Sequence, residues 1–255
     1  MTPGFLGTGT ITSALVTGLC TSAHPSASIW ISPRNARKAA HLEASFDAVH
    51  VGADNQEVVD RADVVVLAVL PQDAEAILQP LRFRADQAVI TLLAGTPLSR
   101  IRSLAAPADS VIRAVPLPSA EKHVGPIALF PGSSAAEALF QDLGTLIAVR
   151  EESELDNLLI LTSLMAPYYA LIGEIVTWAA EAGVDQKNAA DYAASMFRAL
   201  STLVEDREDA DLASMVEACM TPGGLNETAL RVMREQGGFG PVTAALRSVA
   251  GKIAG

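Results

Sequence analysis

The residues best suited to chemistry stand at the start of the chain, between Phe5 and Leu15. A short apolar run meets Gly7-Thr8-Gly9, and an amphipathic helical pattern follows directly. Gly7 permits a tight turn, Gly9 lets the backbone approach a ligand, and the free N–H groups of a helix start bind phosphate. The arrangement predicts a site for the pyrophosphate of a dinucleotide. Thr12 replaces the third glycine of the usual fingerprint, which predicts slightly wider spacing between helix and strand.

The segment after the second expected strand predicts which dinucleotide binds. An acidic residue at that point would bind the ribose 2′-hydroxyl of NAD. The run from Ile31 to Lys38 contains no acid and includes Ser32, Arg34 and Arg37. A hydroxyl and a guanidinium both suit a 2′-phosphate. We therefore expect NADP(H) as the cofactor; the alternative interpretation is an exposed basic helix start.

Two later strand ends should complete this site. In a doubly wound sheet, ligands bind beyond the carboxyl ends of the strands. The wholly apolar run Val64–Val69 is typical of a central parallel strand buried on both faces, and Leu70 and Pro71 follow it. After the next strand, the small residues Ala94 and Gly95 would let a nicotinamide ring lie close.

The elements that must position these residues alternate over the first part of the chain. Helix-like segments of mixed polarity separate most of the short apolar runs, a pattern that predicts a mainly parallel sheet with helices on both faces. The expected strands are Phe5–Leu6, Ile29–Ile31, Ala48–Val51, Val64–Leu70, Ala88–Leu93, Val111–Val115, Ile127–Phe130 and Leu146–Val149.

The pattern changes near Glu151, where strand-like runs end and long helical segments begin. We predict an α/β domain over residues 1–150 and an all-helical domain over residues 151–255. The acidic run Glu205–Asp209 is expected to be a solvated loop. The expected helices are Glu154–Ala166, Tyr168–Ala182, Gln186–Glu205, Leu212–Cys219, Leu225–Gln236 and Pro241–Ile253.

Composition excludes several classes of protein. Half of the chain is hydrophobic and 18% is charged, which excludes a disordered chain. The formal net charge of -11 argues against nucleic-acid binding. Cys20 and Cys219 form neither a metal-ligand pattern nor a disulfide framework, and they fit a reducing cytoplasm. No export signal or membrane span is expected, because the most apolar stretch, Leu158–Ile172, falls short of the roughly 20 residues of a span. We expect that stretch to be a buried helix, and a subunit interface is one environment that would bury it.

The ordered set of motifs resembles the pyrroline-5-carboxylate reductases over almost the whole chain. The resemblance implies a Rossmann domain followed by a helical domain that interlocks with another subunit, in a homodimer or a higher homo-oligomer. It also implies reduction of a cyclic imine carboxylate with NAD(P)H, in a site between the domains. The motifs that carry it are Phe5–Ile11, Ser32–Asn35, Ala53–Asn55, Val66–Gln72, Leu93–Gly95, Arg113–Pro116, Glu181–Val184 and Met220–Gly224.

The same resemblance implies roles for individual residues. Successive segments of the first domain would contact the pyrophosphate, the 2′-phosphate, the adenosine ribose and the nicotinamide of the cofactor, in that order. The implied cofactor contacts are Gly7, Thr8, Gly9, Thr10, Ile11, Ser32, Arg34, Asn35, Asn55, Ala68, Leu70, Pro71 and Ala94.

The departures from the family concentrate where substrate should bind. Leu225-Asn226 stand in place of the Thr-Thr that holds the substrate carboxylate, and Leu70 replaces a lysine. Val115–Ser119 and Met165–Tyr169 also differ from the family's motifs. Backbone N–H groups at Gly223-Gly224 remain candidates for a carboxylate. The catalytic candidates are Thr221, Lys122, His123 and Tyr168, and the substrate-binding candidates are Gly223, Gly224, Asn226, Ser119 and Tyr169.

The charged and aromatic candidates also have structural interpretations without a catalytic role. Lys122 and His123 would be solvated charges of a surface loop, and Tyr168 and Tyr169 would be ordinary helix packing. For the whole chain, the sequence favours a reductase of a cyclic imine carboxylate. The alternatives are an NADPH-dependent reductase of a different imine or carbonyl compound on the same scaffold, or a regulatory protein that binds NADP(H) without turnover.

Overall fold

The computed structural model describes residues 1–206 and 211–254 and divides into two compact units, Met1–Leu159 and Ile160–Gly255. The first unit is α/β and the second is helical. Residues 207–209 of the acidic run expected to be a loop lie outside the described ranges, and Glu205 still belongs to helix α9 (Gln186–Glu205).

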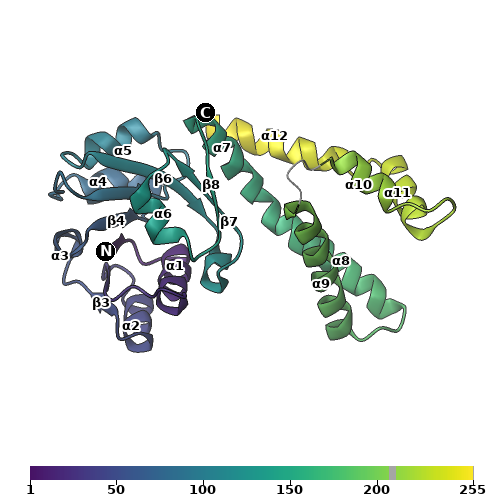
Figure 1. Ribbon diagram of the computed structural model, residues 1–255, viewed down its shortest axis with the longest axis horizontal. Helices are drawn as coiled ribbons and strands as arrows, with labels where there is room; N and C mark the ends of the chain where they lie inside the picture. Colours follow the sequence, from purple (N-terminus) through teal and green to yellow (C-terminus); the bar gives the residue numbers. More distant parts are fainter. Residues whose placement is uncertain (207–210, 255) are drawn as a thin grey trace. The chain divides into compact units, whose positions relative to one another are not determined.

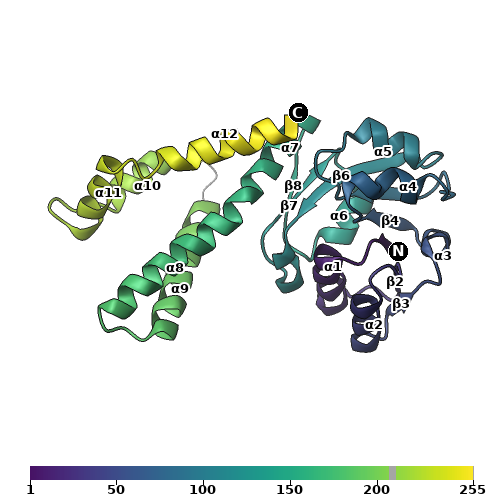
Figure 2. The same ribbon diagram turned by 180° about the vertical axis from the view of Figure 1, so that it is seen from behind.

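The first unit is built on one eight-stranded sheet in the order β3-β2-β1-β4-β5-β6-β7-β8 (Figures 1 and 2). The first six strands are parallel, β7 is antiparallel to β6, and β8 is parallel to β7. The strand order reverses between β1 and β4, which makes their carboxyl ends the switch point where such sheets bind ligands. The strands are β1 (Pro3–Leu6), β2 (Ile29–Ile31), β3 (Val49–Val51), β4 (Val64–Leu67), β5 (Ala88–Thr91), β6 (Ser110–Pro116), β7 (Pro126–Phe130) and β8 (Thr145–Ala148).

Helices cover both faces of this sheet, which confirms the predicted fold class. Successive side chains of a strand point to opposite faces, so Phe5 joins one hydrophobic cluster and Leu6 the other. Residues of α1, α2 and α6 pack into the first cluster, and residues of α3, α4 and α5 into the second (Figure 1). The helices are α1 (Thr10–Thr21), α2 (Ala36–Ser45), α3 (Asn55–Arg61), α4 (Ala74–Leu78), α5 (Leu98–Leu104) and α6 (Ser134–Phe140), with short 3-10 helices η1 (Pro71–Asp73) and η2 (Pro118–Lys122).

A buried arginine fastens helix α7 (Glu152–Leu161) to the sheet. Arg113 of β6 is 3% exposed, and its guanidinium donates to a carboxylate oxygen of Glu152 and to one of Asp156, each at 2.7 Å. Glu152 also accepts the backbone N–H of Leu98 at the start of α5. Because of these contacts, the first turns of α7 belong to the α/β unit, although the helical pattern of the sequence begins near residue 151.

The second unit is helical, and few of its described side chains are buried. The η3 turn (Thr162–Leu164) leads from α7 into α8 (Met165–Glu181), and α8 packs beside α9 (Figures 1 and 2). The break expected between Glu154–Ala166 and Tyr168–Ala182 falls earlier, at η3, and Pro167 lies in the first turn of α8, where no intrahelical N–H bond is lost. The remaining helices are α10 (Leu212–Ala218), α11 (Leu225–Glu235) and α12 (Gly240–Ala254).

Large apolar side chains of this unit are exposed in the single chain. Among its described residues, Ala189 and Ala193 are the only buried apolar ones, whereas Tyr169 is 71% exposed and Trp178 is 70% exposed. In the single chain Leu158–Ile172 is not buried, so its expected burial at a subunit interface stays a prediction. Within the described ranges, one continuous helical run, Glu152–Glu181, is long and apolar enough to cross a membrane by length and composition alone. One such run is weak evidence for a span, since the core helix of a soluble protein passes the same test.

Candidate cofactor and substrate site

The glycine-rich turn joins β1 to α1 at the switch point of the sheet. Gly7 has a φ of +96°, and a Cβ placed on it would lie 2.5 Å from the carbonyl oxygen of Ala68, which follows β4. Only glycine fits there, because both the backbone conformation and the space exclude a side chain. Gly9 is the N-cap of α1, and a Cβ placed on it would meet nothing within 4 Å. Open space therefore stands directly over the start of the helix.

Three hydroxyl groups hold this turn from beneath. Ser32 accepts the N–H of Gly7 at 2.9 Å, and Thr8 donates to the carbonyl oxygen of Ser32 at 2.6 Å. Thr12 donates to the carbonyl oxygen of Gly7, also at 2.6 Å. All three side chains are buried, with Ser32 and Thr12 fully so. The turn is thus fixed by hydrogen bonds before any ligand binds.

These contacts change one sequence-based expectation. Ser32 was expected to meet a 2′-phosphate, but its hydroxyl is buried and bonded to the glycine turn, so its role here is to support that turn. The buried hydroxyl of Thr12 links the first turn of α1 to Gly7, and the wider spacing of helix and strand expected from Thr12 stays a prediction. Only the backbone of Thr8 is left for a ligand, because its side chain bonds to Ser32.

A cavity of about 480 Å³ opens above the turn, at the ends of β1 and β4. The first turn of α1 carries no acidic residue, and no side chain caps its N-terminus. The positive end of the helix dipole and its free N–H groups are therefore available to an anion. The cavity is lined by Gly7, Thr8, Gly9, Arg34, Asn35, Ala36, Ala68, Val69, Leu70 and Asp73.

Arg34 lines this cavity but is already paired. Its guanidinium donates to Asp73 at 2.8 Å, and both side chains are partly exposed. Asp73 was not among the sequence candidates, and nothing in its local pattern distinguishes it from an ordinary helix-start residue. Asn35 caps α2 by accepting the N–H of Lys38, and the ammonium of Lys38 donates to the hydroxyl of Thr10 at 3.0 Å. Positive side chains thus gather where the sequence predicted a 2′-phosphate site.

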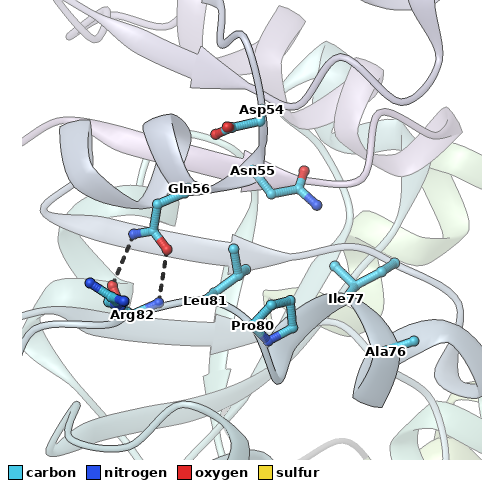
Figure 3. Close-up of a pocket in the computed structure, with 8 residues that line it drawn as sticks. All are labelled: Asp54, Asn55, Gln56, Ala76, Ile77, Pro80, Leu81 and Arg82. Carbon is cyan, nitrogen blue, oxygen red and sulfur yellow. Dashed lines mark hydrogen bonds between the residues drawn. The ribbon is translucent and has the colours of Figure 1, made fainter.

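Asn55 lies at a different cavity from the glycine turn. It begins α3 and lines an open cavity of about 580 Å³ between α3 and α4, together with Ile77 and Pro80 (Figure 3). On the same rim, Gln56 accepts the N–H of Arg82 and donates to its carbonyl oxygen (Figure 3). The predicted contact of Asn55 with a ribose stays a prediction.

The other expected cofactor contacts lie at the same edge of the sheet. Ile11 is half-buried in the first turn of α1, Pro71 begins η1 beside the cavity, and Ala94 is exposed after β5. Leu70 is 58% exposed, so a large apolar side chain faces outward where the family has a lysine.

Lys122 and His123 lie away from the glycine turn. The hairpin between β6 and β7 folds over α1, and the His123 ring lies 3.0 Å from the carbonyl oxygen of Gly18 and 3.4 Å from the Thr21 hydroxyl. Thr21 is eleven residues after Thr10, about 16 Å along the helix at 1.5 Å per residue. The assignment of His123 and Lys122 as catalytic candidates is therefore not supported, and the surface-loop interpretation fits Lys122, which is exposed.

Ser119 also supports this hairpin. Its hydroxyl donates to the carbonyl oxygen of Val124 at 2.8 Å, within the turn that ends at Gly125. Gly125 needs the space: a Cβ there would lie 2.6 Å from the Ser119 hydroxyl. The structure gives Ser119 a structural bond within the loop, whereas the sequence suggested a substrate contact.

The second group of candidates forms the turn before α11. The N–H of Gly223 donates to a carboxylate oxygen of Glu227 at 2.6 Å, and the N–H of Gly224 donates to the carbonyl oxygen of Thr221 at 2.7 Å. Asn226 donates to the carbonyl oxygen of Cys219 at 2.8 Å. The turn thus uses its own donors, and the N–H groups expected to hold a substrate carboxylate are engaged. Glu227 was missed, although an acid three residues after a helix N-cap commonly reaches back to such N–H groups.

The two tyrosines of α8 differ in their surroundings. The Tyr168 ring packs edge-on against Phe197 of α9, with ring centroids 6.1 Å apart, and also against the Tyr169 ring. Tyr169 is 71% exposed. Tyr168 therefore joins two helices of the second unit, as helix packing requires, and the predicted roles of both residues toward a substrate stay predictions.

Comparison with known proteins follows the same division of the chain. A family model described as NADP oxidoreductase, coenzyme F420-dependent, matches residues 2–95, and one described as pyrroline-5-carboxylate reductase dimerisation matches residues 152–254. The chain is 25% identical over 241 residues to the pyrroline-5-carboxylate reductase of Vibrio alginolyticus, covering 91% of this chain and 88% of the relative.

Solved structures share the fold along the full length. The 1-pyrroline-5-carboxylate reductase of Streptococcus pyogenes superposes with a TM-score of 0.84 at 23% identity, covering 99% of this chain and 98% of the other. The pyrroline carboxylate reductase of Plasmodium falciparum, solved with NADP bound, has a TM-score of 0.84 at 15% identity, with 99% and 97% covered.

The fold and these matches define an oxidoreductase with a Rossmann-type dinucleotide-binding domain followed by a helical dimerisation domain. Within that class, the chain is similar over about nine tenths of its length to the pyrroline-5-carboxylate reductases.

Proposed function

We propose that this chain reduces the C=N bond of a cyclic imine carboxylate with NADPH, and that pyrroline-5-carboxylate is the substrate. The observation that carries the proposal is the cavity at the β1/β4 switch point, whose glycine turn is already fixed by buried hydroxyls. Relatives that match over most of their length are named pyrroline-5-carboxylate reductases, which supports the same assignment.

The residues of the cavity fit a dinucleotide. A Cβ at Gly9 would project into open space at the helix start, so the missing side chain leaves room for a pyrophosphate. Arg34 and Lys38 would meet a 2′-phosphate, while Ala68 and Leu70 would lie along the cofactor. When bound, a reduced nicotinamide dinucleotide supplies a hydride for C=N reduction. The protein's own part is to bind and orient, and a protonated imine needs no further acid during that step.

One observation favours a second candidate, a reductase of a different imine. Glu227 places its own carboxylate on the Gly223 N–H, and Leu225, where the family has threonine, is 92% exposed. A substrate carboxylate would have to displace Glu227 from this turn and would meet its negative charge. An imine without a carboxylate would not meet this obstacle.

Assembly and location extend the proposal. The exposed apolar faces of α8 and α9 exceed what one copy covers, and large apolar surfaces of this kind are interaction sites. The helical region also matches a dimerisation family, so we propose a homodimer as the minimal unit. A cytoplasmic location would suit Cys20 and Cys219, which are both free thiols.

Steady-state kinetics with a panel of cyclic imines test the proposal. With pyrroline-5-carboxylate and NADPH, kcat/KM above about 10⁵ M⁻¹s⁻¹ would establish the first candidate. Efficient turnover of a carboxylate-free imine, with pyrroline-5-carboxylate poorly used, would establish the second. Binding of NADPH without turnover of any imine would overturn both in favour of a regulatory protein.

Two variants locate the substrate determinant. In Leu225→Thr/Asn226→Thr and in Glu227→Gln, we expect kcat/KM for pyrroline-5-carboxylate to rise about tenfold, the scale of one charged hydrogen bond. Glu235→Gln is the matched control: it removes a carboxylate from the same helix, where it pairs only with Arg231 in the described contacts. An equal change in all three variants would mean that the turn does not read the substrate.

A further inference from the structure

The Arg34–Asp73 pair is the one place where a negative side chain lines the cofactor cavity within the described residues. The Arg34 guanidinium and the Asp73 carboxylate meet at 2.8 Å, with 55% and 34% of their side chains exposed. Any group that binds Arg34 from the cavity must therefore share or displace Asp73.

Among the contacts of the described residues, the Asp73 carboxylate pairs only with Arg34. Asp73 is the N-cap of α4, yet its side chain caps no N–H group of that helix. Its backbone N–H donates to the carbonyl oxygen of Leu70, which would be possible for any residue type except proline. The Asp73 carboxylate therefore accepts a hydrogen bond from Arg34 at the rim of the cavity.

We propose that Asp73 sets the balance between NADPH and NADH by competing with the 2′-phosphate for Arg34. This inference rests on the proposed function and deepens it. A 2′-phosphate and the Asp73 carboxylate are both anions that seek the same guanidinium, so NADPH binds only by weakening the existing pair and bringing two negative groups together. NADH carries no such phosphate, and the pair stays intact when it binds. Asp73 therefore lowers NADPH affinity and leaves NADH affinity alone.

Direct binding measurements on Asp73→Asn test this competition. The change keeps the shape of the side chain and removes its charge. We expect the Kd of NADPH to fall about three- to tenfold at low ionic strength, because partly exposed pairs of this kind are weak and screened. The Kd of NADH should change by less than about twofold, and the gain for NADPH should shrink in high salt.

A nearby carboxylate provides the control. Glu75 lies on the same helix, is 62% exposed and pairs with Arg100, and it does not line the cavity. Glu75→Gln should leave both dissociation constants unchanged. Equal shifts for NADPH and NADH in Asp73→Asn, an unchanged or weaker NADPH affinity, or the same shift in Glu75→Gln would overturn the inference.

A third variant separates this inference from the proposed function. Arg34→Ala should weaken NADPH about tenfold and leave NADH nearly unchanged if Arg34 reads the 2′-phosphate. If Arg34→Ala has that effect and Asp73→Asn does not, the cofactor assignment stands and the competition fails. If NADPH does not bind the wild type, the proposed function fails.

Discussion

The buried arginine of β6 permits a sharp test of what holds α7 to the sheet. Replacing Arg113 with methionine keeps a long side chain in the core and removes two charge-assisted hydrogen bonds, to Glu152 and Asp156. Removing one partner of a fully buried pair costs about 3–5 kcal/mol. Here the two carboxylates are 31% and 37% exposed, so water partly replaces the lost bonds. We therefore expect the low end, about 3 kcal/mol of unfolding free energy.

Urea unfolding at fixed protein concentration measures this loss, and thermal unfolding should show a Tm about 6–12 °C lower. Glu152→Ala should destabilise more than Asp156→Ala, because Glu152 also accepts the N–H of Leu98. Arg100→Met is the control, since its ion pair with Glu75 is largely exposed and contributes at most about 1 kcal/mol. The reasoning is refuted if Arg113→Met loses less than about 1 kcal/mol or no more than Arg100→Met.

Three further predictions follow from the glycine turn, the half-buried thiol and the helical unit. Gly7→Ala should lower both stability and NADPH binding, because its Cβ would meet the carbonyl oxygen of Ala68. Gly9→Ala should fold normally and lose only NADPH binding, because its Cβ would meet no other described atom of the chain within 4 Å. Differential scanning fluorimetry with and without NADPH distinguishes the two variants. Burial raises the pKa of Cys20 from 9.0 to about 11. In the Cys219→Ser variant, iodoacetamide should therefore alkylate Cys20 at pH 8 about 100-fold more slowly in the folded protein than in urea. The alkylation of the folded protein should accelerate as the pH rises toward 11. Equal rates in folded and unfolded protein would contradict this. Light scattering should give twice the chain mass of 26.6 kDa, and a stable monomer at micromolar concentration would refute the homodimer.

The sheet and its switch point were predictable from the sequence, because buried parallel strands read as short apolar runs and the glycine turn has a fixed spacing. Every expected strand run matches an observed strand. The cofactor class followed from the same motifs, and a dinucleotide-binding fold was confirmed.

The positions of some candidate residues depend on contacts that adjacent sequence does not show. His123 was a candidate because a histidine near a reducible imine could bind a carboxylate or donate a proton, yet the β6–β7 hairpin carries it onto the later turns of α1. Gly18 was the available signal: a Cβ there would lie 2.5 Å from the carbonyl oxygen of Ala120, so a glycine inside a helix marked the close approach of another segment. Asp73 gave no comparable signal, because its meaning depends on Arg34, 39 positions earlier.

The scarcity of buried side chains in the helical unit has a consequence for how the protein is made. Burial of apolar surface is the main free energy that offsets the entropy of ordering a chain. With only Ala189 and Ala193 buried among its described residues, one copy of this unit lacks that free energy. The α/β unit has two interior clusters of its own and should fold first during synthesis. If a second copy covers its apolar faces, the helical unit should reach its final form at a rate that rises with chain concentration.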